Sequence, residues 1–418
     1  MKVIVLGAGV TGIAAAWYLH KAGHEVTVID RQAAPGMETS FANGGQISVS
    51  HAEPWANPQA PAKVWKWLGQ EDAPLLFRLR LDIHQWLWGL AFLRECTRER
   101  TRHNIQQIVA LGLYSRASLQ ALRAETGIAY DALTRGILHF YTDKQEFDNA
   151  QEPAQLMRDH GCDLQMVSAD ECVAIEPALA TVRGQLAGGS MTASDESGDA
   201  HKFTGALARL CAQAGVVFRY GADVLGLLRE GERVSGVVVD VDRKRETVAA
   251  DAFVVCMGSY SPRLLGPLGV HLSIYPAKGY SVTMPVADPA RAHAVSLTDD
   301  EHTLVFSRLG DRLRIAGTAE LNGYNTELNE VRCQAILRRA VELFPGAGDA
   351  SRAQFWTGLR PATPSNLPYV GKTRYSNLYV DTGHGTLGWT LACGSGRAIA
   401  DIISGRQPAV DFRFYGMP

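Results

Sequence analysis

The 418-residue chain lacks a surplus of charge of either sign, because 41 Lys and Arg stand against 43 Asp and Glu, for a net charge of −2. Proteins that bind nucleic acids carry a basic excess, which displaces counterions from the phosphates. We therefore expect no nucleic acid among its partners. Repeats and low-complexity tracts are also lacking, and the 46% hydrophobic and 20% charged residues are typical of a globular protein long enough for two domains.

Cysteines are few and show no paired spacing. Their odd number and wide spread predict buried thiols in a reducing compartment, with no disulfide framework and no metal site formed with the histidines. The seven are Cys96, Cys162, Cys172, Cys211, Cys256, Cys333 and Cys393.

Long apolar runs are lacking as well. Residues 3–19 are apolar enough to resemble a signal peptide, but the glycines within them and the strand pattern after them indicate a folded unit instead. No later segment reaches the roughly 20 apolar residues of a membrane-spanning helix. We expect a cytoplasmic protein that is soluble or peripheral.

The first thirty residues contain the strongest motif. Residues 3–6 predict a buried strand, Gly7, Gly9 and Gly12 follow it, residues 13–22 predict a helix, and residues 25–29 predict a second strand that ends at Asp30. In such a unit the first glycine allows a tight turn, the second lets a pyrophosphate approach, and the third lets helix and strand pack closely. Asp30 stands where a carboxylate takes the ribose hydroxyls. We predict a dinucleotide site, with a purely structural turn as the alternative.

The motif alone leaves FAD and NAD both open. The following loop, residues 38–48, is small and polar and contains the adjacent Gly44 and Gly45. Free amides and hydroxyls in such a loop suit a long, resident ligand such as FAD better than a cofactor that leaves at each turnover. A surface turn is the alternative reading of this loop.

Further along the chain, the patterns predict that the nucleotide-binding unit is discontinuous. Prolines, tryptophans and lysines between residues 54 and 74 mark a domain crossing, and helices are expected at 83–99, 104–126 and 148–160. A strand at 252–256 ends in Gly258, and the terminus repeats the order strand, glycine-rich turn and helix over 378–404. Residues 274–355 read mainly as strands.

The expected fold class is therefore α/β, with a discontinuous Rossmann-type FAD-binding domain and an α+β second domain built on an antiparallel sheet that carries the substrate. We assign residues 1–52, 186–272 and 367–418 to the FAD-binding domain, and residues 53–185 and 273–366 to the substrate domain.

Two stretches near the C-terminus carry a family resemblance. The sequence Gly-His-Gly-Thr-Leu-Gly-Trp-Thr at 383–390 and the sequence Trp-Thr-Gly-Leu-Arg-Pro at 356–361 resemble the D-amino acid oxidase superfamily of FAD enzymes. Residues 40–48, 275–281 and 391–396 support the match, in the family's order. Within the superfamily, the resemblance is greatest to the small subunits of the bacterial D-amino acid dehydrogenases.

The resemblance implies oxidation of a D-amino acid to an imino acid by hydride transfer from Cα to flavin N5, followed by hydrolysis to a 2-oxo acid and ammonia. It also implies respiratory electron transfer to a quinone or another carrier. Dehydrogenases for D-proline or hydroxy-D-proline, and oxygen-using oxidases of the sarcosine or glycine type, are alternatives. A nucleotide-dependent sensor is a non-enzymatic alternative.

Arg360 is, by resemblance, the clamp for the substrate carboxylate. A guanidinium offers two parallel donors and thereby fixes both the position and the rotation of a carboxylate. A salt bridge at a domain interface is the alternative. Lys278 and Tyr280 follow the family's strand and are expected to line the same pocket, with a structural role as an equal alternative. No Asp or Glu lies in 275–281 or 356–363, so we expect a mostly apolar side-chain pocket and small neutral D-amino acids as substrates.

The resemblance also implies a set of FAD-binding residues, and the absence of a recognised linkage motif predicts that the FAD is not covalently attached. His384 is expected to act through the backbone around it, where amides of Gly385, Leu387 and Gly388 hold the flavin pyrimidine edge, rather than as a base. The expected set is Gly7, Gly9, Gly12, Asp30, Arg31, Ser40, Asn43, Gly44, Gly45, Gln46, Val224, Gly258, Gly383, His384, Gly385, Thr386, Leu387, Gly388, Trp389 and Thr390.

One aromatic and basic segment suggests a peripheral membrane contact, on the inner face of the bacterial plasma membrane. It comprises Trp86, Trp88, Phe92 and Leu93, followed by Arg94, Arg98, Arg100 and Arg102. Such a face suits a helix that lies in the membrane interface, but aromatic stripes are more often part of a core. His51 and His302 belong to no motif, and we expect ordinary polar roles for both.

Overall fold

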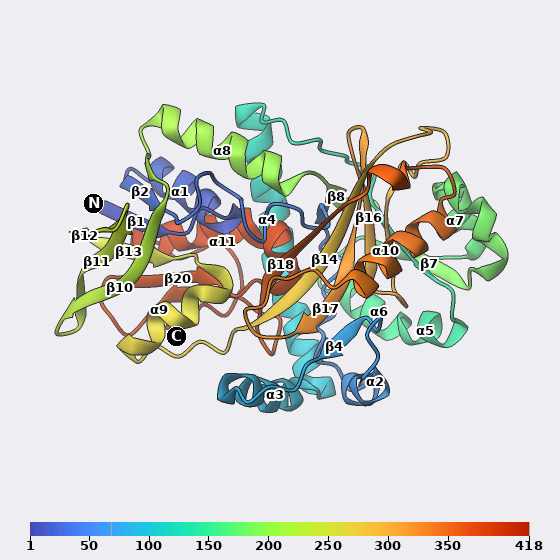
Figure 1. Cartoon of the computed structure of the whole chain (residues 1–418), viewed down its shortest axis with the longest axis horizontal. Coiled ribbons are helices and arrows are strands. Elements are labelled where there is room, and N and C mark those ends of the chain that lie inside the picture. Colours follow the sequence, from blue (N-terminus) through green and yellow to red (C-terminus); the bar gives the residue numbers. More distant parts are fainter. Residues whose placement is uncertain (68, 418) are drawn as a thin grey trace.

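The computed structural model describes residues 1–67 and 69–417, and two sheets dominate it (Figure 1). The first has six strands in the order β19-β20-β13-β1-β2-β9, all parallel except the β19 edge. Its strands are β1 (Lys2–Leu6), β2 (Glu25–Ile29), β9 (Val217–Arg219), β13 (Ala252–Val255), β19 (Tyr369–Lys372) and β20 (Leu378–Thr382). Nearly continuous apolar sequences in β1 and β13 fit burial on both faces.

Helices cover one face of this sheet, and a small sheet covers the other. The helical side consists of α1 (Val10–Lys21), α8 (Ala200–Ala214) and α11 (Gly388–Ile403), which share one apolar core. The opposite side consists of β10 (Ala222–Glu230), β11 (Arg233–Val241), β12 (Lys244–Val248) and α9 (Ser261–Leu265). This is a doubly covered nucleotide-binding layer assembled from three parts of the chain.

The second sheet has nine strands in the order β18-β14-β17-β16-β15-β5-β7-β6, with β4 also paired to β17. Most pairs are antiparallel, and α7 (Ala169–Ile175) and α10 (Glu330–Leu343) share a core with one face. The strands are β4 (Leu75–Phe77), β5 (Ile137–Tyr141), β6 (Leu164–Val167), β7 (Gly188–Thr192), β14 (Tyr275–Pro285), β15 (Ser296–Asp299), β16 (Leu304–Leu309), β17 (Arg312–Leu321) and β18 (Gln354–Ala362).

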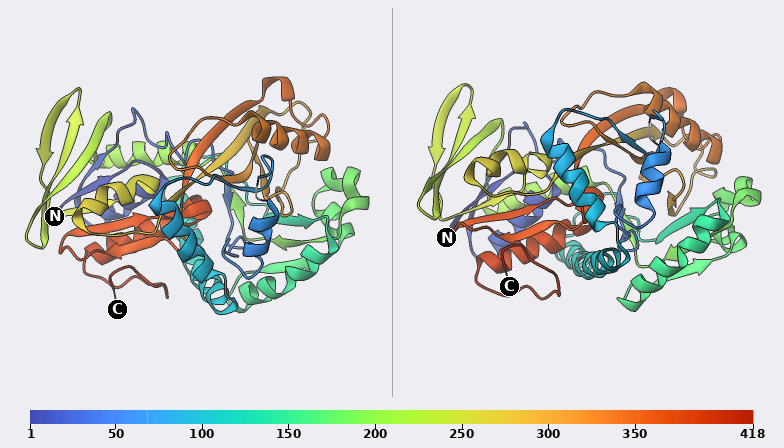
Figure 2. Two further views of the ribbon diagram at one scale, coloured as in Figure 1. Left: turned by 60° about the horizontal axis from the view of Figure 1, so that its bottom comes forward. Right: turned by 90° about the horizontal axis from the view of Figure 1, so that it is seen from below.

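Connecting elements join the two halves, which Figure 2 shows from two further sides. The long helix α4 (Arg98–Thr126) starts at Thr97, whose side chain accepts from the Arg100 amide, and ends at Gly127 in a left-handed conformation with φ of 64°. The other connecting elements are α2 (Ala60–Trp67), α3 (Ile83–Glu95), α5 (Lys144–Asn149), α6 (Gln151–Asp159), the short pair β3 (Gln46–Ile47) and β8 (Glu196–Ser197), and the 3-10 helices η1 (Pro177–Gln185), η2 (Gly258–Tyr260), η3 (Gly266–Leu268), η4 (Ala350–Arg352) and η5 (Gly385–Leu387).

Three expectations about elements and boundaries differ from the structure. Strand β7 falls within residues 186–272 but pairs with β5 and β6 of the second sheet. Leu119 and Leu122 of α4 fall within residues 53–185 but pack into the core of the nucleotide layer. The helix expected at 148–160 is two helices, α5 and α6, which meet at Ala150. Tertiary packing decided these points, because periodicity within one segment does not say which sheet or core the segment joins.

Candidate active site

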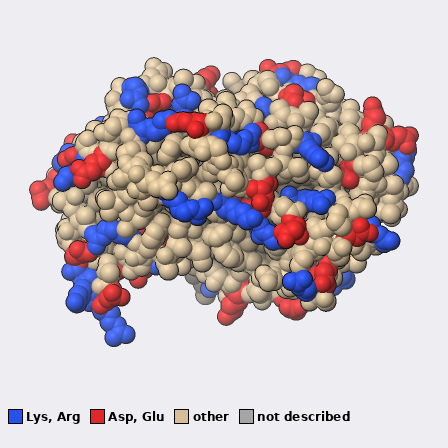
Figure 3. All heavy atoms as spheres, turned by 90° about the horizontal axis from the view of Figure 1, so that it is seen from above, with Lys and Arg blue, Asp and Glu red and all other residues tan. Residues whose placement is uncertain are grey.

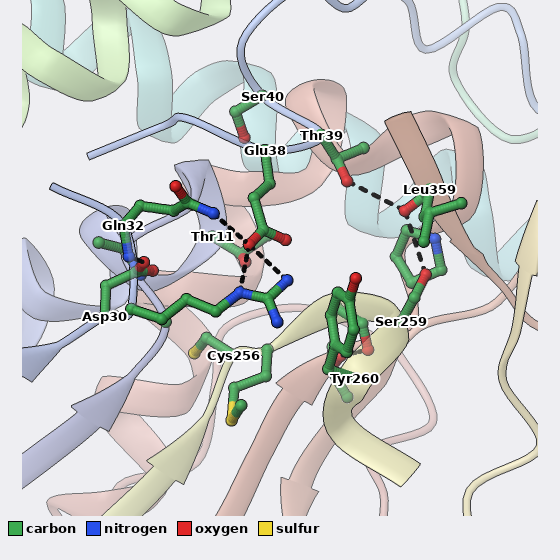
Figure 4. Close-up of a pocket in the computed structure, with 18 of the residues that line it drawn as sticks. Thr11, Asp30, Gln32, Glu38, Thr39, Ser40, Cys256, Ser259, Tyr260 and Leu359 are labelled. Carbon is green, nitrogen blue, oxygen red and sulfur yellow. Dashed lines mark hydrogen bonds and ion pairs between the residues drawn. The ribbon is translucent and has the colours of Figure 1, made fainter. Parts of the chain in front are cut away.

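A cavity of about 310 Å³ lies at the carboxyl ends of β1, β2 and β13 in the six-stranded sheet (Figure 4). This edge of an open parallel sheet is where dinucleotides bind. Thr39 Oγ1 and Ser259 Oγ both donate to the carbonyl oxygen of Leu359, at 3.0 and 3.1 Å. These contacts join the wall of this cavity to β18 of the other sheet.

The glycines of the N-terminal motif have separate structural roles. Gly7 has φ of +109°, and a Cβ there would lie 2.6 Å from the carbonyl oxygen of Cys256. A Cβ on Gly12 would lie 2.0 Å from the carbonyl oxygen of Gly7, so Gly12 permits close packing and does not line the cavity. Gly9 caps α1 without a side-chain hydrogen bond, and a Cβ there would meet only Ser40 Oγ, at 3.7 Å. The Val10 amide at this helix start donates to Ser40 Oγ at 3.1 Å, and the amides that follow it suit a pyrophosphate.

Asp30 closes the inner end of the same turn. Its carboxylate accepts from the backbone N–H of Ala8 at 2.6 Å and from that of Gln32 at 2.7 Å. Burial raises the pKa of Asp30, although both amide bonds act in the opposite direction. Arg31 pairs with Glu38 at 2.6 Å and lies 4.0 Å from the ring centroid of Tyr260. Asp30 therefore orders the turn, and Arg31 forms part of the cavity wall.

The C-terminal glycine-rich turn closes the cavity from the other side. Helix α11 starts at Gly388, and its N-cap, Leu387, makes no side-chain cap bond, so this start is also free to bind negative charge. His384 is buried, with Nε2 3.0 Å from Ser395 Oγ and 3.3 Å from an oxygen of the buried Asp381. The His384 ring therefore anchors the turn from behind. Trp389 and Thr390 also hold neighbouring backbone, since Trp389 donates to the Gly198 carbonyl and Thr390 accepts from the Ser48 amide.

A second cavity, of about 690 Å³, adjoins the first. Val10, Thr39, Ser40, Gly385 and Gly388 line both, so the two form one continuous hollow between the sheets. Residues expected to bind FAD divide between the two cavities. The first cavity is lined by Gly7, Gly9, Asp30, Arg31, Ser40, Val224, Gly258, Gly383, His384, Gly385 and Gly388. The residues that line only the second cavity are Asn43, Gly44, Gly45, Gln46, Thr386, Leu387, Trp389 and Thr390.

Arg360 lies in the wall of the second cavity, where protein surrounds its guanidinium except on the cavity side. Its Nη1 donates to the Thr318 carbonyl at 2.6 Å, and a Cβ on Gly279 would lie only 2.3 Å from the guanidinium carbon. No described carboxylate lies within ion-pairing distance of it. Burial, with a smaller contribution from the Arg332 charge, lowers the pKa of Arg360 to about 10. A buried cation without an acid is costly unless a ligand supplies one.

Lys278 and Tyr280 point to the other face of β14. The Lys278 ammonium, which is 2% exposed, lies 3.0 Å from Glu320 and donates to Asn325 Oδ1. The Tyr280 hydroxyl donates to the same Glu320, and its ring packs in the core beneath α10. Tyr280 contributes atoms to the cavity wall and Lys278 does not. Strand alternation explains the outcome, because Gly279 between them is the residue that faces Arg360.

The cavity wall around Arg360 contains both apolar and charged residues. Val305 and Ala316 are among its small and apolar residues. Its charged or titratable residues besides Arg360 include His51, Glu53, Lys63, His139, Tyr141, Asp143, Glu146, Asp300 and Glu301. Glu146 pairs with Lys63 at 3.0 Å, and Asp300 pairs with His139 at 3.1 Å. Sequence reasoning gave His51 only an ordinary polar role and did not single out the others, because these residues come from loops and strand ends far apart in the chain.

The cysteines and one cluster of Asp299, Glu301 and His302 are further groups that could be reactive or bind a metal. Six of the seven cysteines are buried thiols, as expected, and Cys96 is half-buried. Asp299, Glu301 and His302 have ligand-type atoms within 4.8 Å of one another. Asp299 already binds Arg339 and His302, and Glu301 accepts from Thr142 and Asp143, so we assign no metal to them.

Comparisons with known proteins agree with this geometry. The D-amino acid dehydrogenase of Dechloromonas aromatica (strain RCB) is 59% identical over 99% of both chains, and that of Paramagnetospirillum magneticum (strain ATCC 700264 / AMB-1) is 56% identical over 100% of this chain and 98% of the other. The structure of glycine oxidase from Geobacillus kaustophilus matches with a TM-score of 0.75 at 25% identity, covering 98% of this chain and 96% of the other. The profile of the FAD dependent oxidoreductases matches residues 2–402, so the chain belongs to this family and is an FAD-dependent enzyme.

Proposed function

We propose that this enzyme oxidises D-amino acids to imino acids, which hydrolyse to 2-oxo acids and ammonia, and that it passes the electrons to a quinone or another carrier. The single observation that carries the proposal is Arg360, a cation without a carboxylate partner among the described residues, in a cavity continuous with the dinucleotide cavity. The two relatives above are both named for activity on D-amino acids.

The residues present fit FAD in an extended position across both cavities. The N-terminus of α1 would face the pyrophosphate, and the N-terminus of α11 would face the flavin ring. Bound FAD supplies the hydride acceptor. The protein supplies position: Arg360 fixes the substrate carboxylate, and Gly279 leaves room for that guanidinium.

The proposal is tested by turnover of a panel of D- and L-amino acids, D-proline and sarcosine with an artificial dye, alongside oxygen uptake. We expect dye reduction with D-amino acids and little oxygen uptake. Fast oxygen uptake with glycine or sarcosine would favour an oxidase instead, and no reduction by any amino acid would refute the proposal.

The surface around α3 supports a peripheral membrane contact. Ile83, Trp86, Leu87, Leu90 and Leu93 form one helical face and are 47–65% exposed, while Trp88 and Phe92 on the opposite face are buried. Only part of the expected aromatic segment therefore faces outward. Leu79 and Leu81, just before α3, are exposed as well. We call these two leucines and the exposed apolar residues of α3 the α3 face. Single exposed apolar residues are common, but a continuous helical stripe is not.

The charges around the α3 face suit an anionic bilayer. Lys66, Arg80, Arg94 and Arg98 are exposed near it, whereas Arg100 and Arg102 pair with Glu95 and Glu152. Helices α2 and α3 both lie along the bottom of the molecule in Figure 1. On the opposite side, seen in Figure 3, basic and acidic side chains are interspersed. Among the described residues no helix is long and apolar enough to cross a membrane. We propose that the α3 face lies in the interface of an anionic membrane.

Vesicle sedimentation tests this contact. The wild-type protein should sediment with vesicles of 3:1 phosphatidylcholine and phosphatidylglycerol, and less with phosphatidylcholine alone. Replacing both Leu87 and Leu90 by Gln should abolish sedimentation but leave dye-linked turnover unchanged. The matched control replaces Val217 of β9 and Leu228 of β10 by Gln, since these residues are 53% and 46% exposed but line neither cavity. Equal loss in both variants, or none in either, would refute the α3 face as the contact.

A further inference from the structure

Oxidation of an amino acid releases a proton as well as a hydride. The ammonium of the substrate must first lose a proton, because only the free amine can push electrons toward Cα as the C–H bond breaks. The hydride then leaves with both electrons of that bond, and a C=N bond forms in the iminium product. One proton per turnover therefore has to leave the substrate, which is a task for a positioned base. This argument rests on the proposed function.

One cluster in the cavity has the chemistry for this task. His139 of β5 faces the cavity, its side chain is 7% exposed, and its Nδ1 lies 3.1 Å from Asp300 Oδ2. Its Nε2 is buried and has no hydrogen-bond partner among the described residues. The ring of His51 lies beside it, with centroids 5.8 Å apart and planes tilted by 33°. An unpartnered buried nitrogen calls for an explanation, and here it lies in the cavity wall beside a second imidazole, where it can accept a proton.

The backbone that carries His51 is held firmly. The buried Asp195 accepts from the amides of Val49 and Ser50 at 3.0 and 3.1 Å, and from the Ser50 hydroxyl at 2.7 Å. Arg116 pairs with the same carboxylate at 2.9 Å. His51 therefore projects into the cavity from a fixed point, as a catalytic group requires.

The charges around the two rings shift the pKa values of His51 and His139 in opposite directions. Burial, together with the charges of His139 and Arg360, lowers the pKa of His51 to about 4, although Asp300 acts in the opposite direction. Burial also disfavours the charged form of His139, but Asp300 and, less strongly, Asp195 more than offset it, so that the pKa of His139 is raised. A proton on His51 is therefore passed downhill to His139. A bound substrate carboxylate would neutralise Arg360 and make His51 a better acceptor.

Other titratable groups face this pair from neighbouring elements. Tyr141 lies on β5, and Glu301 follows β15 but is satisfied by backbone amides. Glu146 of α5 is paired with Lys63 of α2. Glu53 is open to the cavity although protein surrounds it, and burial and the Asp300 charge raise its pKa to about 7. Glu53 can therefore exchange a proton near neutral pH at the outer end of the cluster.

We propose that His51 accepts the proton released from the substrate amino group, and that the His139–Asp300 pair takes it on toward solvent. Arg360 holds the opposite end of the substrate and contributes to the field at His51. The proposed path thus begins near the carboxylate clamp and runs along the cavity-facing side of β15 and β5.

The test is the pH dependence of flavin reduction by D-alanine, measured by stopped-flow absorbance on the FAD-loaded enzyme. His51→Ala, His139→Gln and Asp300→Asn should each reduce the rate at pH 7 by on the order of 100-fold. The loss should shrink to less than about threefold at pH 10.5, where the substrate amine is already free. Added imidazole should restore part of the His51→Ala rate at pH 7. A purely structural role would lower the rate equally at every pH.

The matched control is His302→Gln, which removes a histidine that also pairs with an aspartate, at 3.0 Å from Asp299, but is half-exposed and does not line the cavity. Its pH profile should match the wild type. A normal FAD spectrum shows that a variant is folded, and the pH profile of any one such variant is sufficient for the test. If D-alanine reduces the wild-type flavin but the variants lose the same fraction of the reduction rate at every pH, the relay is overturned and the proposed function is not. A wild-type enzyme that no D-amino acid reduces would overturn the proposed function and the relay together.

Discussion

Replacing Arg360 should lower kcat/KM without lowering the thermal stability of the protein. Arg360→Lys keeps a positive charge but loses the two-pronged donor, and lysine is shorter and cannot reach both carboxylate oxygens from β18. Hydrogen bonds to charged groups contribute about 1.5–3 kcal/mol each, so losing one together with its alignment should cost on the order of 2–4 kcal/mol in transition-state binding. This corresponds to a decrease in kcat/KM of roughly 30- to 1000-fold.

The stability of the same variants should move differently. Arg360 is charged in both the folded and the unfolded state at pH 7, and its lowered pKa of about 10 means that burial in the empty cavity is unfavourable for the charge. Arg360→Met should therefore keep or raise the Tm of the protein without substrate, while kcat/KM falls further than in Arg360→Lys. Functional groups often carry such a stability cost.

The assay compares dye-linked kcat/KM with thermal unfolding, and uses Arg332→Lys as a matched control. Arg332 is also a buried arginine that donates to backbone carbonyls, those of Glu71 and Ala319, but it does not line the cavity. The control should lose stability and retain most of its kcat/KM. If Arg360→Met has the wild-type kcat/KM with a normal FAD spectrum, the clamp has been placed wrongly.

Three further predictions concern the cofactor, the substrate and the pH dependence of stability. Denaturation should release yellow FAD into the supernatant, and flavin retained in the precipitate would contradict non-covalent binding. Small neutral D-amino acids should be better substrates than their L-forms, because the clamp and the hydride acceptor fix two directions at Cα. Their kcat/KM should also exceed that of D-lysine, by roughly tenfold if the ammonium of the lysine side chain cannot reach the carboxylates of the cavity wall. D-Lysine as the best substrate would show that those carboxylates form the side-chain pocket. Glu53 has a raised folded pKa of about 7, so its contribution to stability is present below pH 4.5 and is lost as the pH rises through 7. Glu53→Gln should therefore raise the Tm relative to wild type at pH 8 and not at pH 4, and an equal shift at both values would refute this assignment.

Local patterns were sufficient for the nucleotide half of the fold. The apolar strand, the three glycines and the helix after them are constraints between neighbours in the chain, and β1, α1 and β2 lie within a few residues of their expected bounds. The same holds for the glycine-rich turn and helix α11 near the C-terminus. Arg360 was identified through its motif, and its position in the cavity wall agrees with the role proposed for it.

Strand alternation limited what could be predicted about β14. From sequence, Lys278 and Tyr280 are polar residues on a strand next to the clamp, and either face was open to them. Their orientation follows from Glu320 on β17, which binds both, and from the core beneath α10. A buried partner on another strand cannot be read from spacing within one strand.

The sequence by itself determined the family and the need for FAD, and its motifs were sufficient to propose Arg360 as the carboxylate clamp, because each motif consists of residues close together in the chain. Only the tertiary structure decided which polar residues share the cavity. His51, His139 and Asp300 come from a loop, a strand and a strand end up to 249 positions apart, and no local pattern links them. The apolar stripe of α3 is similar: periodicity predicts a helix, but only packing decides that Trp88 and Phe92 face the core while Trp86 and Leu93 face solvent. Burial is a property of the whole fold, so the chemistry of the cavity wall emerges only when distant segments meet.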